Sequence, residues 1–269
     1  MGKTYLTKVL MVCAVWAACG LSASTASADF LDDFDGASGS APSAADWIVS
    51  GWANNGGPTS VTLNGAGKVV VAAGEPAVTV AGLKLADAHA VDTDPGGQYH
   101  RAKFETYSTP GGAGHKKFGL RVSAGAEAGG GKGVIHLSSI AGAAGMTLEV
   151  GNWEMPSGGE EMGRWFTGIG EEDAGTWIID VYAGKALAYF NGTLVADTTT
   201  TADAVVGPLS TSPAWADIVP RASQITAYCE TINGGTAEFE AIGLGTIPEP
   251  STLALLGIGV LLAVRRKSA

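Results

Sequence analysis

The sequence predicts an all-β protein whose folded body lies between two hydrophobic ends. In the run Lys117 to Ser123 every second residue is apolar, which places Phe118, Leu120 and Val122 on one face of a strand. Glycine supplies 40 of the 269 residues and gathers between such runs, where turns are needed. No window of the body keeps an apolar period of about 3.6 residues over three turns, so we expect helices only at the two ends.

The N-terminal end has the form of a secretion signal. Two lysines precede an apolar stretch from Val9 to Leu21, and the small residues Ala26 and Ala28 then mark a cleavage site. We therefore expect residues 1–28 to be a signal peptide, with a hydrophobic helix that signal peptidase removes. The alternative is a lipoprotein signal in which Cys19 carries the lipid.

The C-terminal end combines three features within its last twenty-two residues. A Pro-Glu-Pro motif comes first, an apolar run from Thr252 to Val264 follows, and three cations complete the end. The run is short for a membrane span, which takes about 20 residues. The cations favour the cytoplasmic side, which leaves the body on the far side of the membrane. These residues are the motif Pro248, Glu249 and Pro250, and the membrane stop Arg265, Arg266 and Lys267.

These three parts, in this order, resemble the PEP-CTERM sorting tail of Gram-negative bacteria. The resemblance implies that an exosortase, an intramembrane cysteine transpeptidase, cuts near the motif and passes the protein to the cell surface or an exopolysaccharide matrix. Prolines on both sides of Glu249 cannot continue a helix, so we expect an extended, accessible motif. An ordinary C-terminal anchor is the alternative. The predicted domains are a signal peptide (1–28), a β-sandwich (29–246) and a sorting tail (247–269).

The mature body is strongly acidic. Between residues 29 and 250, 11 Lys and Arg stand against 26 Asp and Glu, which gives a net charge of −15. Such a surface repels nucleic acid, so we expect no nucleic-acid partner. Cys229 is the one cysteine left after the signal peptide, so an intramolecular disulfide is excluded and stability must come from a sizeable core.

Alternating runs predict about ten to twelve strands in a single domain. The sharpest local prediction is a hairpin at Asn191-Gly192, a pair that accepts the positive φ angles of a tight turn. Trp47 and Trp177 lie in apolar alternation and are expected in the core. The predicted strand runs are Val61 to Val71, Ala77 to Leu83, Tyr99 to Tyr107, Lys117 to Ser123, Val134 to Ile140, Met146 to Val150, Thr176 to Tyr182, Ala186 to Phe190, Gln224 to Cys229 and Ala237 to Leu244.

Two parts of the body resemble concanavalin-like domains. The acidic aromatic segment Phe30 to Gly36, followed by Trp47, is similar to the opening strand of such sandwiches. The runs Thr176 to Tyr182 and Leu187 to Val195 resemble a laminin-G-like strand pair. The resemblance implies a single jelly-roll β-sandwich. An immunoglobulin-like sandwich is the alternative, but such domains have about 100 residues.

Catalytic patterns are weak. Retaining glycoside hydrolases of this fold carry Glu and Asp at alternate positions of one strand, because the reaction needs two carboxyl groups about 5 Å apart. The sequence has no Glu-x-Asp-x-Glu or Glu-x-Asp-x-x-Glu. The nearest match, Glu238 and Glu240, lacks a third carboxylate and is interpreted as charges on an edge strand. We therefore expect a binding module rather than an enzyme.

Candidate ligand contacts lie in loop-like surroundings. Asp92 and Asp94 precede Pro-Gly-Gly and are the preferred calcium candidate, with Asp33 and Asp35 as a second; an acidic turn without metal is the alternative for both. Trp52, Trp153 and Trp165 neighbour Asn, Gly, Glu and Arg, which makes them candidate sugar-stacking residues. Each is equally compatible with a lid over the core.

The sequence thus predicts an exported β-sandwich of a Gram-negative bacterium that acts at the cell surface or in the extracellular matrix. Its role is glycan-binding or structural, and a secreted glycoside hydrolase or lyase of the same fold is the alternative. The expected partners are signal peptidase and exosortase during export, a polysaccharide afterwards, and the membrane through the tail before processing.

Overall fold

The computed structural model describes residues 30–53, 59–74, 79–89, 99–107, 116–123, 133–139, 145–152, 161–171, 173–182, 184–206, 224–232 and 234–247. These residues form strands and one short 3-10 helix, all within the compact unit Ala28–Ile247. The elements are β1 (Phe30–Asp32), β2 (Trp47–Ala53), β3 (Thr59–Leu63), β4 (Val69–Ala73), β5 (Thr79–Leu85), η1 (Asp87–His89), β6 (Tyr99–Tyr107), β7 (Lys116–Ser123), β8 (Gly133–Ser139), β9 (Met146–Asn152), β10 (Glu161–Phe166), β11 (Gly175–Tyr182), β12 (Lys185–Phe190), β13 (Thr193–Asp197), β14 (Ala204–Val206), β15 (Gln224–Ile232) and β16 (Thr236–Ile247).

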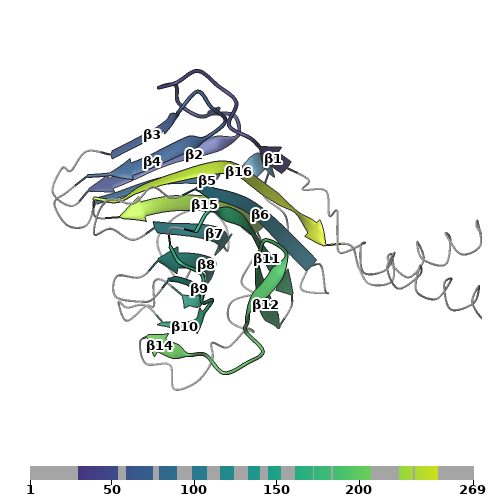
Figure 1. Ribbon diagram of the computed structural model, residues 1–269. Helices are drawn as coiled ribbons and strands as arrows, with labels where there is room; N and C mark the ends of the chain where they lie inside the picture. Colours follow the sequence, from purple (N-terminus) through teal and green to yellow (C-terminus); the bar gives the residue numbers. More distant parts are fainter. Residues whose placement is uncertain are drawn as a thin grey trace, which may run out of the picture. The chain divides into compact units, whose positions relative to one another are not determined.

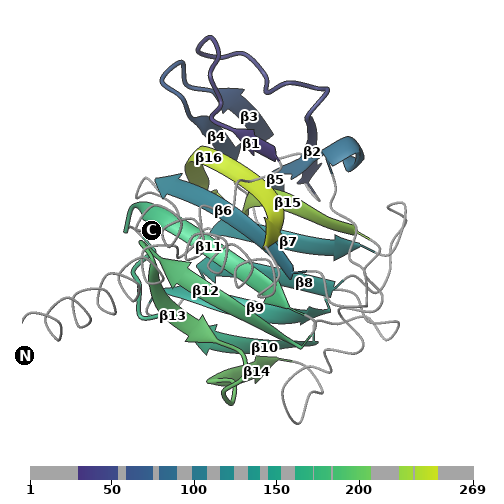
Figure 2. The same cartoon turned by 90° about the vertical axis from the view of Figure 1, so that its right-hand side faces the viewer.

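The strands form two antiparallel sheets of eight strands each (Figure 1). Sheet A has the order β13-β12-β11-β6-β16-β4-β3, with β1 paired to β16. Its strands β6, β11, β12 and β13 follow one another in Figure 2. Sheet B has the order β14-β10-β9-β8-β7-β15-β5-β2. Neighbours far apart in the sequence, such as β7 and β15, show that long-range pairing defines the fold.

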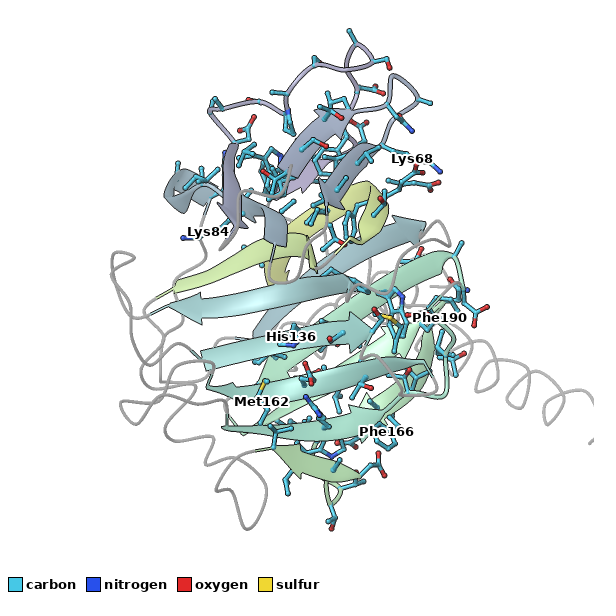
Figure 3. All side chains as sticks on the ribbon, turned by 90° about the vertical axis from the view of Figure 1, so that its left-hand side faces the viewer. Lys68, Lys84, His136, Met162, Phe166 and Phe190 are labelled. Carbon is cyan, nitrogen blue, oxygen red and sulfur yellow. The ribbon has the colours of Figure 1, made fainter. Side chains whose placement is uncertain are left out.

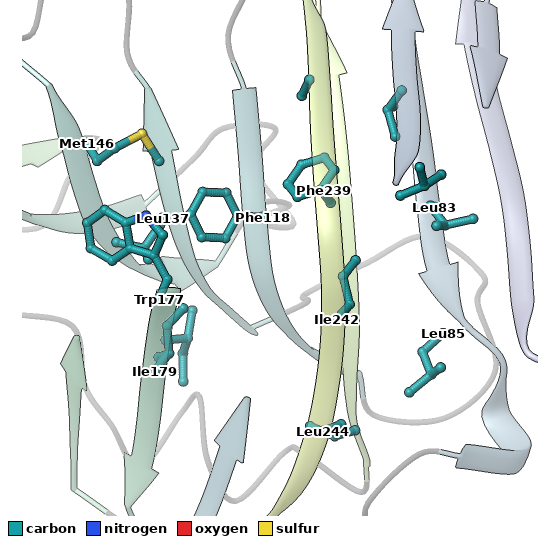
Figure 4. Close-up of a cluster of buried hydrophobic side chains, with 14 of the residues drawn as sticks. Leu83, Leu85, Phe118, Leu137, Met146, Trp177, Ile179, Phe239, Ile242 and Leu244 are labelled. Atoms are coloured by element: carbon teal, nitrogen blue, oxygen red, sulfur yellow. The ribbon is translucent and has the colours of Figure 1, made fainter. Parts of the chain in front are cut away.

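One core joins the two sheets. Phe118 on β7 of sheet B lies 6.1 Å from the Trp177 ring and 6.0 Å from the Phe239 ring, both in sheet A (Figure 4). Aliphatic side chains that alternate along the strands fill the space around these rings, as the period of two predicts. The predicted burial of Trp47 and Trp177 is confirmed. The body is therefore a β-sandwich.

The hairpin at Asn191-Gly192 is confirmed. Asn191 has a φ of 48° and Gly192 a φ of 79°, the signs that a type I′ turn requires. The turn joins β12 to β13, and the Asn191 side chain accepts a hydrogen bond from the Thr176 amide at 2.9 Å. This bond ties the turn to β11.

The prediction of one run from Val61 to Val71 is wrong. Two strands, β3 and β4, pair there through a turn in which the Asn64 side chain accepts bonds from the amides of Ala66 and Lys68. Gly65 and Gly67 have positive φ in this turn. Splits of this kind, and the short strands β1, β10, β13 and β14, raise the number of strands in the described residues to sixteen, above the ten to twelve expected.

Strand β16 is an interior strand rather than an edge. It pairs with β6 along one side and with β4 and then β1 along the other. Glu238 and Glu240 therefore are not edge charges, and a bulge near Glu240 lets both approach Lys68, at 3.8 and 3.0 Å. The interpretation of this acidic pair as edge charges is thus corrected.

The two hydrophobic ends lie outside the described residues, and the signal helix and the C-terminal helix stay predictions, as do the domain boundaries. Within the described part of the chain, no helix is long and apolar enough to cross a membrane.

Candidate functional site on sheet B

Nine positions on strands β8, β9 and β10 form one part of the outer face of sheet B, the face turned away from the core. Ile135, Leu137, Leu148 and Trp165 point into the core, so the residues that alternate with them lie on the other side. The register sets three rows of three, which we call the β8–β10 face. The rows are Ser138, Thr147 and Phe166; His136, Glu149 and Arg164; and Val134, Gly151 and Met162.

The middle row is a buried charged cluster. Glu149 is 1% exposed; its Oε2 contacts His136 Nε2, and its Oε1 accepts a bond from Arg164 Nε at 2.5 Å. His136 is fully buried, and the Arg164 side chain is 23% exposed. A buried carboxylate is tolerated only when its oxygens are bonded in this way. Lys84, which Figure 3 shows on the same sheet with His136, Met162 and Phe166, is also buried.

Close packing of β7 against β8 positions the histidine. Gly119 lies opposite His136 in the register, and a Cβ atom on Gly119 would be 2.5 Å from the His136 Cα and 2.6 Å from the Ile135 carbonyl oxygen. No side chain fits at this position. The glycine therefore allows the approach of the strand that carries His136.

The described part of this face does not reproduce the carboxylate pair of a retaining hydrolase. The second carboxyl is needed two residues along the same strand, about 5 Å away. Two residues beyond Glu149 the chain has Gly151, and the neighbour across the ladder is Met162. Both oxygens of Glu149 are also already bonded.

The structure corrects the prediction that Trp165 is a sugar-stacking residue in a loop. It lies on strand β10 and not in a loop, it is 2% exposed, and its Nε1–H donates to the Thr200 carbonyl oxygen at 3.1 Å. Neighbours such as Gly163 and Arg164 are typical of a loop, but here they lie within strand β10. Trp165 is a core residue and offers no ring to a sugar.

Other predicted site residues are placed only in part or not at all. Trp52 lies on strand β2, paired with Val80, and its side chain is outside the described set. Several other predicted site residues lie entirely outside the described residues: Trp153, the calcium candidates Asp92 and Asp94, the cleavage site Ala26 and Ala28, the motif Pro248, Glu249 and Pro250, and the cations Arg265, Arg266 and Lys267. They remain predictions.

A second polar site surrounds the start of the body. Asp32 accepts the Trp47 Nε1–H at 2.6 Å and the Phe34 amide at 2.7 Å, which holds the buried Phe34 at a φ of 54°. A cavity of 240 Å³ borders these residues, with Asp35 and Asp46 in its wall. Hydrogen bonds from Ser43 and His89 lower the pKa of Asp46. No group of three acidic, His or Cys residues in the described ranges forms a metal site, and this includes Asp33 and Asp35.

A family model described as the PEP-CTERM protein-sorting motif matches residues 246–267. The chain carries a PEP-CTERM sorting signal. This signal implies export, exosortase processing and sorting to the cell surface. The match begins within β16, whose last residue, Ile247, directly precedes Pro248.

Solved structures share the fold of the body. An endo-acting O-glycanase from the human gut microbiota aligns at a TM-score of 0.57 and 13% identity, over 82% of this chain and 100% of its own. The laminarinase of Rhodothermus marinus aligns at a TM-score of 0.56 and 12% identity, over 82% of this chain and 98% of its own. A glycosyl hydrolase family 16 protein of Mycobacterium smegmatis aligns at a TM-score of 0.51 and 18% identity, over 81% of this chain and 100% of its own. At these identities the likeness establishes the fold, which is a concanavalin-like jelly-roll sandwich. Among curated proteins, none matches this sequence.

Sequence reasoning missed the β8–β10 face. The sequence patterns identify neither Glu149 nor His136 as a site residue. A signal is nevertheless present for two of the three residues, because His136 and Glu149 each occupy the polar position of an alternating run. What the sequence did not reveal is that the three residues meet.

Proposed function

We propose that this PEP-CTERM protein binds a neutral polysaccharide at the cell surface or in the extracellular matrix, through the β8–β10 face. One observation carries the proposal: an exposed aromatic ring, Phe166, lies beside the partly exposed Arg164 on a fold whose solved examples act on glycans. Fold alone does not decide function. The sorting signal adds that the chain is directed to the cell surface.

The net charge of the body favours a neutral polymer. Residues 29–250 carry a net charge of −15, so they repel an anionic polysaccharide unless cations screen the charge. Arg164 does not offset this charge, because its guanidinium is already paired with Glu149. Neutral hexose polymers, such as the β-1,3-glucan implied by the name of one structural neighbour, a beta-1,3-glucanase, are therefore the preferred ligand class.

Binding fits the described face better than cleavage. Hydrolysis with retention needs one carboxylate as nucleophile and another as acid, both reaching the sugar. Glu149 is buried with both oxygens bonded, and position 151 has no side chain. A carbohydrate-binding module needs only a shaped face with hydrogen-bonding groups and an aromatic contact.

Glycoside hydrolysis is the second candidate, favoured by the enzymes among the structural neighbours and by a buried Glu on this sheet. Its substrate class is the same. The two candidates differ in whether glycosidic bonds are cut.

A glycan array with residues 29–247, with calcium and with EDTA, tests the proposal. We expect binding to neutral glucans, followed by no new reducing ends when the bound glycan is incubated with protein for a day. New reducing ends would establish the hydrolase. Absence of binding and cleavage on every glycan would reject both candidates in favour of a structural role.

A further inference from the structure

Phe166 is a large apolar side chain exposed on the β8–β10 face. Its exposed fraction is 54%, whereas Phe34, Phe118 and Phe239 are at most 4% exposed. Phe166 ends strand β10, and Figure 3 shows it at one end of the outer face of sheet B. Single exposed apolar residues are common on proteins, so the residues around Phe166 decide its meaning.

Two buried hydroxyl groups lie in the same row. Phe166 is opposite Thr147, and Thr147 is opposite Ser138. Both residues are fully buried, and the Ser138 Oγ and Thr147 Oγ1 atoms have no hydrogen-bond partner within the described structure. Buried hydroxyls are nearly always paired in folded proteins. Because both hydroxyls are fully buried, they lie beneath the surface of the row, and Phe166 is its exposed member.

Hydrogen-bond donors stand beside the ring. Arg164 lies two residues before Phe166, on the same face of β10, and its side chain is partly exposed. Its Nε–H bonds Glu149, and a guanidinium carries five N–H donors in a fixed plane. The backbone amide of Phe166 donates to the exposed Asp203 at 2.8 Å, which fixes the end of the strand. The ring is thus held on a rigid element.

We propose that Phe166 is the platform on which one pyranose ring of the polysaccharide stacks, with its hydroxyl edge toward the partly exposed Arg164. This inference rests on the proposed function and names the ligand's configuration. An aromatic ring accepts a flat surface of C–H groups. Among hexoses, β-linked glucose presents that surface best, because its hydroxyls are equatorial and its axial positions carry hydrogen. A mannose ring presents an axial hydroxyl at C2 instead.

The test compares two substitutions at Phe166 with a matched control. The full-length protein, in a detergent without a sugar headgroup, is titrated calorimetrically with a soluble β-1,3-glucan and with a mannan. The variants are Phe166→Ala, Phe166→Trp and, as the control, Leu194→Ala, which truncates a side chain 48% exposed on sheet A. Thermal unfolding of each variant checks that it is folded. Because Phe166 and Leu194 are both exposed, we expect the Tm of each variant to stay close to that of the wild type.

We expect the wild type to prefer the glucan. Phe166→Ala should weaken glucan binding by about two- to tenfold, Phe166→Trp should keep or strengthen it, and Leu194→Ala should leave it unchanged. Glucan binding that is equal in Phe166→Ala and wild type would overturn the platform and leave the proposed function standing. A wild type that binds no glycan would reject the proposed function together with the platform.

Discussion

His136 on β8 and Glu149 on β9 face each other across sheet B and bond side chain to side chain, although both are almost completely buried. They lie on the face turned away from the core. Arg164 completes the cluster from β10. Charge in such a place is stable only while every member is present.

Glu149→Gln should therefore destabilise the protein strongly. The substitution leaves Arg164 without its carboxylate, and removing one partner of a buried pair costs about 3 to 5 kcal/mol. Glu240→Gln is the matched control, because Glu240 pairs with Lys68 at the surface with 46% of its side chain exposed. We expect the control to lose at most about 1 kcal/mol in urea unfolding. Equal losses in the two variants would show that the buried cluster carries no special stability.

Gly119→Ala should disturb the same cluster through the backbone. Its Cβ would lie 2.5 Å from the His136 Cα, so β7 and β8 must move apart. Overpacking of this kind costs about 1 to 3 kcal/mol. Gly184→Ala has nothing within 4 Å of its added Cβ and should change the unfolding free energy by less than about 0.5 kcal/mol. Differential scanning calorimetry measures both, and an unchanged Tm for Gly119→Ala would contradict the close approach.

Acid should weaken the contact between Asp46 and its neighbours. Hydrogen bonds from Ser43 and His89 hold the folded-state pKa of Asp46 below its ordinary value of 3.8. The carboxylate therefore contributes stability in full above that value, and the contribution is lost as the pH falls through the folded-state pKa. Asp46→Asn should lower the Tm at pH about 5, and this effect should shrink as the pH falls further below 3.8. A Tm difference that does not change with pH would refute this linkage.

The junction between β16 and the sorting signal should limit processing. Thr246 and Ile247 pair with His100 and Tyr99 of β6, and Pro248 follows without a linker. An enzyme that reads residues before the motif must detach this end of the strand. Four Gly and Ser residues inserted after Ile247 should therefore raise the processing rate about twofold or more, the equivalent of one net hydrogen bond.

The control for this prediction inserts the same four residues after Thr201, an exposed residue in the turn that follows β13. Mass spectrometry of the C-terminus in cells that contain exosortase measures the processed fraction. If both insertions change the rate equally, pairing of the β16 end does not limit the reaction.

Local signals in the sequence predicted what depends on neighbouring residues. The Asn191-Gly192 turn, the burial of Trp47 and Trp177 and the all-β class each follow from a few adjacent positions, through turn chemistry or a period of two. Trp165 shows where this reasoning fails. A run with Gly163 and Arg164 beside it resembles a loop until strand β9 supplies a partner on one side and β14 on the other.

The sequence by itself determined that the protein carries a sorting signal and that its fold is all-β, because a sorting motif and an alternating pattern each depend on residues that are close along the chain. Only the tertiary structure decided the candidate site. Glu149 lies 13 residues from His136 and 15 from Arg164, and antiparallel register, which no single strand encodes, brings the three side chains together. The same register places an exposed Phe166 beside two buried hydroxyls, because alternation fixes a side chain's face and pairing fixes its neighbours.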